Sequence, residues 1–93
     1  MPTILSVLDL STAHLPEEVC DDLSGEPGVI AHRVTYGWLM WVPADPDAFA
    51  AETIDPMPEE VLAIQRYARR LGCQYVLFDR DAEQVDELPT WQW

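Results

Sequence analysis

The chain contains no lysine, and its Lys and Arg residues together are five arginines. These stand against 17 aspartates and glutamates, so the 93 residues carry a formal charge of −12 at pH 7. Such a surface repels nucleic acid and anionic membranes over a Debye length of about 8 Å, which excludes direct binding to either. Two interpretations of the charge stay open: a basic partner, or an acidic surface that serves solubility in a salt-adapted cell.

Signals for metals, disulfides and membranes are equally sparse. The only two cysteines, Cys20 and Cys73, form no CxxC motif, and His14 and His32 lack ligand spacing, so no four-ligand zinc site is expected. We expect two buried thiols, no metal and no other cofactor. No charged leader and no run approaching about 20 apolar residues occurs, which predicts a soluble, cytoplasmic protein.

The remaining pattern predicts a single acidic domain over residues 1–93 with the element order β-α-β-β-α-β. This order is typical of an α+β sandwich with two helices on one face of a mostly antiparallel sheet, and a ferredoxin-like strand order is one way to build it. Strands are expected over 3–10, 29–35, 38–43 and 74–79, helices over 16–24 and 58–71, a loop with one helical turn over 44–57, a turn at 80–82 and an extended segment over 85–93.

The strand over 38–43 is apolar on both faces. Trp38, Met40 and Val42 share one face, and Leu39 and Trp41 share the other. This indicates either a central strand or an outward face reserved for a partner.

The first predicted helix begins at Pro16 and ends before Gly25, and it concentrates acidic residues on one face. At 100° per residue, four carboxylates fall within an arc of about 140° while the apolar residues face the opposite side. No basic residue offsets them within the helix, so helix stability does not explain their placement. The four residues are Glu17, Glu18, Asp21 and Asp22.

Catalytic alternatives are weak. Asp79-Arg80-Asp81 has the DxD form that can hold a divalent metal, but no glycine-rich phosphate loop accompanies it, and a turn explains it better. Ser11, Thr12 and His14 could supply a nucleophile and a base, but no third orienting residue is evident. Cys73 is read as a buried structural thiol. We therefore expect no enzyme.

Three stretches carry a resemblance to a known family: LeuSerThrAlaHisLeu at 10–15, TyrGlyTrp with TrpValPro at 36–43, and residues 68–93 ending in TrpGlnTrp. The chain resembles a family of small acidic domains of plasmids, phages and other mobile elements, in which Asp-Gly is typical where Asp81-Ala82 stands here. More narrowly, it resembles the type I-C anti-CRISPR proteins. The resemblance implies inhibition by binding the Cascade surveillance complex, with no catalytic residues to carry over.

The sequence thus predicts a monomeric, non-enzymatic inhibitor that mimics DNA toward a basic, DNA-binding surface of Cascade. An acidic face can occupy a groove built for phosphates, because helical carboxylates lie about 5–6 Å apart. Trp91 and Trp93 are a further candidate partner surface. The alternative is an interaction module of a mobile element whose charge reflects salt adaptation. The predicted partner-binding residues are Glu17, Glu18, Asp21 and Asp22, extended by Glu26, Asp45 and Asp47.

Overall fold

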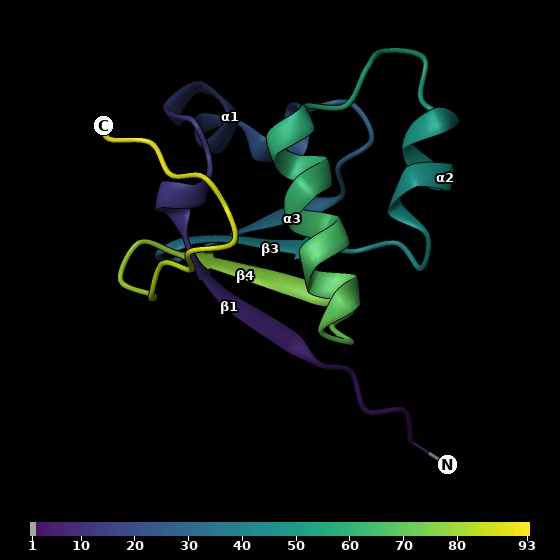
Figure 1. Ribbon diagram of the computed structural model, residues 1–93, viewed down its shortest axis with the longest axis horizontal. Coiled ribbons are helices and arrows are strands. Elements are labelled where there is room, and N and C mark those ends of the chain that lie inside the picture. Colours follow the sequence, from purple (N-terminus) through teal and green to yellow (C-terminus); the bar gives the residue numbers. More distant parts are fainter. Residues whose placement is uncertain (1) are drawn as a thin grey trace.

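The computed structural model describes residues 2–93, which form a four-stranded sheet with helices on one side (Figure 1). The β1–β4 pair is parallel and the other two pairs are antiparallel, which confirms the predicted α+β class. The strands are β1 (Val7–Ser11), β2 (Ala31–Val34), β3 (Gly37–Trp41) and β4 (Tyr75–Asp79), in the order β1-β4-β3-β2. The helices are α1 (Glu17–Asp21), α2 (Pro46–Ala51) and α3 (Glu59–Arg70), with 3-10 turns at Thr12–His14 and Leu23–Gly25.

The strand order differs from the ferredoxin-like arrangement, in which β1 would lie between β3 and β4. Here β4 pairs directly with β3, and this pairing sets Trp38 beside Phe78 and Met40 beside Val76 on the core side. All four side chains are 5% exposed or less. The most apolar strands therefore occupy the centre, while the strands that carry exposed charges, β1 and β2, form the edges, where charge discourages unwanted pairing.

The core lies between the sheet and the helices. From α3, Val61, Ile64 and Ala68 are buried at helical spacing, as predicted. Leu71 was expected beside them but is 54% exposed, because α3 ends at Arg70 and the chain turns away at Gly72 with φ +81°. No helix within residues 2–93 is long and apolar enough to span a bilayer.

The first helix is shorter than predicted. It ends at Asp21, and Asp22 leaves helical geometry with φ −143° and ψ 60° before the 3-10 turn Leu23–Gly25. The carboxylates of Asp21 and Asp22 oppose the helix dipole at this end and no basic residue stands there, so nothing favours another α-helical turn. The predicted arc of four helical carboxylates is therefore wrong for Asp22.

Two further boundaries also differ from the prediction. The first strand begins at Val7 and not at residue 3. Ser6 is still hydrogen-bonded to Gln74, and the residues before it project from the body of the molecule as an arm (Figure 1). The segment 85–93 contains no strand and instead is hydrogen-bonded to residues 13–15, between β1 and α1. Its position depends on His14, which is 1% exposed.

The buried side chain of His14 connects the segment before α1 to the C-terminal segment 85–93. Its Nε2 accepts from the backbone N–H of Val85 at 3.0 Å, so Nδ1 carries the proton and donates to the carbonyl of Pro89 at 2.8 Å. The neutral ring therefore satisfies a distant donor and a distant acceptor at once.

Candidate functional site: an acidic surface beside two tryptophans

Two glutamates begin α1 and are exposed. Glu17 and Glu18 follow Pro16, whose fixed φ suits the start of a helix. Their carboxylates lie at the positive end of the helix dipole, where negative charge is stabilised. Val19 and Cys20, next in the chain, are buried, so α1 is held with the first turn facing outward.

A third glutamate joins them from a distant part of the chain. Glu60 lies in the first turn of α3 and lines the same surface depression as Glu17 and Glu18, with a volume of about 460 Å³. Trp91 and Trp93 line this depression too. We call these five residues the acidic–aromatic surface.

Both tryptophans are fixed to the chain segment that precedes α1. The indole Nε1 of Trp93 donates to the carbonyl of Leu15 at 3.0 Å, and the backbone N–H of Trp91 donates to the carbonyl of Ala13 at 2.9 Å. Trp93 nevertheless remains 55% exposed. A side chain held in this way loses little conformational entropy when a partner covers it.

No cation within residues 2–93 neutralises the three glutamates. The one salt bridge among these residues joins Arg66 to Asp47. The guanidinium of Arg69 donates hydrogen bonds to the carbonyls of Val42 and Pro43, at 2.6 and 2.8 Å. The negative charge of the acidic–aromatic surface is therefore available to an outside partner.

The next three predicted residues do not line this depression. Asp21 lines a neighbouring cavity that Trp91 and Trp93 also line. Glu26 is half-buried, and Asp22 folds its carboxylate over Gly25, where an added Cβ would clash with it. Asp21, Asp22 and Glu26 therefore do not belong to the acidic–aromatic surface.

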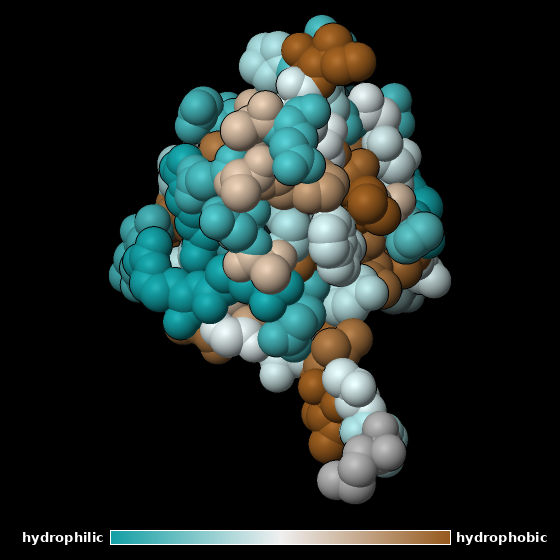
Figure 2. Space-filling view, turned by 90° about the vertical axis from the view of Figure 1, so that its right-hand side faces the viewer, coloured by the Kyte–Doolittle hydropathy of each residue, from teal (hydrophilic) through white to brown (hydrophobic). Residues whose placement is uncertain are grey.

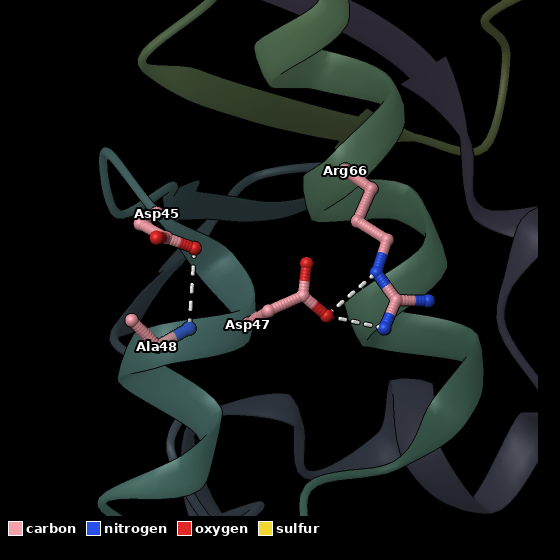
Figure 3. A network of polar contacts seen from close by, with 4 residues as sticks. All are labelled: Asp45, Asp47, Ala48 and Arg66. Carbon is pink, nitrogen blue, oxygen red and sulfur yellow. Dashed lines mark hydrogen bonds and ion pairs between the residues drawn. The ribbon is translucent and has the colours of Figure 1, made fainter.

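The last two predicted residues serve α2 (Figure 3). Asp45 caps this helix, because its Oδ1 accepts from the backbone N–H of Ala48 at 3.2 Å. Asp47 accepts from Arg66 of α3, and this hydrogen bond lowers the pKa of the Asp47 carboxyl. Since α1 and α2 lie on opposite sides of α3 (Figure 1), the structure does not bring Asp45 and Asp47 together with Glu17 and Glu18.

A second cavity of about 510 Å³ lies at the carboxyl ends of β1 and β4. Arg33 stacks over Trp38 at 4.9 Å and Arg80 over Tyr36 at 5.4 Å, so two guanidinium groups with aromatic neighbours face an open space that could hold an anionic group. Segments from all three stretches that carry the family resemblance line it, including 11–13, 36–38, Trp91 and Trp93.

Gly37 explains one of these segments physically. A Cβ at this position would lie 1.8 Å from the carbonyl oxygen of Phe78 on the neighbouring strand, so only glycine allows β3 to approach β4 here. The TyrGlyTrp sequence therefore packs the sheet and shapes the rim of the cavity.

The catalytic candidates have local structural partners. The Oδ1 of Asp79 accepts from the N–H of Asp81 at 2.9 Å, which forms a turn, and Ala82 completes that turn without a positive φ. Ser11 Oγ accepts from the N–H of Ala13, and both ring nitrogens of His14 are engaged. Within residues 2–93 no three His, Cys, Asp or Glu side chains are grouped to hold a metal.

Both cysteines are free thiols. Cys20 is buried, and burial is the main cause that raises its thiol pKa above the ordinary value. Cys73 is half-buried, less enclosed than predicted, because it follows the turn at Gly72.

The comparison with protein families gives one match. A family model described as the C-terminal domain of a family of unknown function, DUF5983, matches residues 7–93. The chain belongs to the DUF5983 family. Searches of the curated proteins and of the solved structures gave no match.

All five residues of the acidic–aromatic surface fall within the matched DUF5983 region. Glu60 was missed as a site residue because a helical projection treats one helix at a time. The usable signal was the ProGluGlu sequence, which occurs at 16–18 and again at 58–60 and starts both α1 and α3.

Proposed function

We propose that this DUF5983 domain is a non-enzymatic inhibitor that acts in the cytoplasm of a bacterial host. It binds a basic, DNA-binding surface of the type I-C Cascade complex and blocks target recognition by occupying the place of DNA. The single observation that supports this proposal is the acidic–aromatic surface, where Glu17, Glu18 and Glu60 have no ion-pair partner among residues 2–93 and lie beside two tryptophans.

The physical case rests on charge and on anchoring. Lysines and arginines that normally hold phosphates would attract the three glutamates, and the charge of −12 would steer the encounter from a distance. Trp91 and Trp93 supply apolar contact area of the kind that dominates binding energy at protein interfaces. Phosphate mimicry alone needs no tryptophan, so the aromatic pair favours a protein partner.

Measuring inhibition with glutamine variants tests this proposal. E17Q/E18Q should weaken binding to purified type I-C Cascade roughly tenfold or more, and adding E60Q should weaken it further, because each change removes an unneutralised carboxylate. The matched control is E52Q/D55N, which removes two exposed carboxylates at the far end of α2 and should change binding less than about twofold. Full inhibition by the triple variant would contradict the proposal.

Salt distinguishes mimicry from salt adaptation. A mimic should be fully folded in dilute buffer, and its complex should weaken steeply as salt is added, since salt screens the charges that steer and hold it. Circular dichroism during dialysis to low salt measures the first point, and competition with target duplex at increasing salt measures the second. Loss of the fold at low salt would instead support the salt-adapted interaction module.

A further inference from the structure

The face of the sheet opposite the helices is apolar and largely uncovered; at one corner the ring of Trp41 packs edge-on against Phe49 of α2, with 5.4 Å between the ring centroids. Leu5, Val7 and Ile30 are each about half exposed, at 50%, 51% and 47%, and they line a shallow hollow with side chains from β3 and β4. The arm that carries Leu5 extends beyond the body as an apolar projection (Figure 2). A sheet face in contact with water normally carries polar residues, so this face is of the kind that a partner covers.

The strand register arranges this face in rows that run across the sheet. One row is apolar at every position, since Val7 pairs with Tyr75, Tyr75 with Trp41, and the N–H of Trp41 bonds to the carbonyl of Ile30. The next row has two leucines at its centre and one ionisable side chain at each end. That central row is Asp9, Leu77, Leu39 and His32.

The two ends of the central row identify the partner by their chemistry, because an imidazole can donate a hydrogen bond to a carboxylate. Asp9 is on the edge strand β1 and His32 on the opposite edge strand β2, and both are exposed. A twofold axis parallel to the strands lays β1 of one copy over β2 of the other, which brings each Asp9 to the His32 of the second copy. A twofold axis perpendicular to the strands would lay Asp9 on Asp9, and like charges would oppose it.

We propose that this face is the interface of a homodimer whose twofold axis runs parallel to the strands. Leu39 and Leu77 of the two copies meet at its centre, and two Asp9–His32 contacts close its edges. Face-to-face sheets usually cross at about 30°, which displaces the edge strands by only about 3–4 Å and leaves both contacts within side-chain reach. In this proposal the protein is a dimer, whereas the sequence predicted a monomer.

This arrangement leaves the acidic–aromatic surface free. The helices α1 and α3 cover the other face of the sheet, so a dimer presents two copies of that surface on its outside (Figure 1). Two chains of −12 repel each other, whereas apolar contact does not depend on charge. Added salt should therefore strengthen the dimer, whereas it should weaken a complex with a basic partner.

Sedimentation equilibrium of the full chain tests the dimer. The expected mass is twice 10.6 kDa at about 100 μM protein and 0.5 M salt, and a monomer under these conditions would overturn the proposal. Leu39→Glu and, separately, Ile30→Glu should raise the dimer dissociation constant at least tenfold, with circular dichroism reporting the fold. The matched control is Leu71→Glu, which changes a leucine about as exposed as Ile30 at the end of α3 and should leave the dissociation constant unchanged.

A charge exchange tests the orientation of the axis. His32→Asp alone sets a new carboxylate against Asp9 of the second copy and should weaken the dimer severalfold. Asp9→Arg alone should weaken it because the carboxylate that accepts from His32 is removed. The double variant D9R/H32D sets a guanidinium against a carboxylate in both contacts and should recover dimerisation. Losses that add in the double variant would overturn the strand-parallel arrangement. E17Q/E18Q should not alter dimerisation, so this test fails or succeeds independently of the proposed function.

Discussion

The short helices α1 and α2 are similar in length, and carboxylates stand at the start of both, yet the two helices use these carboxylates differently. In α2, Asp45 caps the helix and Asp47 pairs with Arg66, so the charge contributes to the fold. In α1, no side chain caps the start of the helix, and Glu17 and Glu18 have no ion-pair partner among residues 2–93. The comparison shows that acidity in this chain has two roles, and that only tertiary contacts distinguish them.

Charge reversal should show most clearly that the carboxylates of the acidic–aromatic surface and those of α2 have different roles. E17K/E18K/E60K should abolish detectable inhibition of Cascade, a loss of about a hundredfold or more, because lysines would meet a basic surface. D45K/D47K should leave inhibition intact while it destabilises α2. An inhibition assay with the triple and the double variant measures the difference. Equal losses of inhibition in the two variants would contradict the assignment of different roles to the two sets of carboxylates.

The acidic–aromatic surface beside α1 includes two tryptophans of the C-terminal segment, and hydrogen bonds to His14 hold that segment in place. His14→Ala should lower the free energy of unfolding by about 2–4 kcal/mol, because it leaves the Val85 N–H without its acceptor and opens a buried cavity. Urea denaturation measures the change. Gln92→Ala, at an exposed position of the same segment, should stay within about 0.5 kcal/mol of the native chain.

The cap of α2 should matter for stability alone. Asp45→Ala should destabilise the domain by about 1 kcal/mol, since it removes the acceptor for the Ala48 N–H, whereas Asp45→Asn keeps an acceptor and should restore most of the loss. Thermal unfolding of both variants provides the measurement. If either variant lost affinity for Cascade, α2 would have to be included in the binding surface.

The smallest expected effect is the pH dependence of the Asp47–Arg66 pair. The hydrogen bond from Arg66 lowers the pKa of Asp47 in the folded state, so the pair stabilises the fold above the unfolded pKa of about 3.9. This contribution is lost as the pH falls through the lower, folded pKa. The stability difference between the native chain and Asp47→Asn should shrink between pH 6 and pH 2.5, and also in 0.5 M salt, because the pair is exposed. A difference independent of pH would mean that the pair contributes nothing in solution.

Local patterns explain which elements were predictable. The hairpin around Tyr36-Gly37, the apolar spacing of α3 and the two faces of β3 follow from side-chain periodicity, which needs only neighbouring residues. Element ends were less accurate, as at Asp22 and Leu71, because they depend on what the rest of the fold places beside them. The segment 85–93 was predicted as extended, but its pairing with His14 and Ala13 could not be read from its own sequence.

The candidate site was predictable only in part. Glu17, Glu18, Trp91 and Trp93 were named from the sequence, and the structure brings them together. Glu60 was not, because the relative placement of two helices is not a property of either one.

The sequence by itself determined the net charge, the absence of lysine, the α+β class and the apolar outer face of β3, because composition and periodicity are local properties of the chain. The tertiary structure alone decided which carboxylates are neutralised, which strands form the edges, and that Asp9 and His32 end one row across the sheet. These depend on contacts between residues far apart in the chain. Such contacts form where burial and register, rather than sequence proximity, give the lowest free energy.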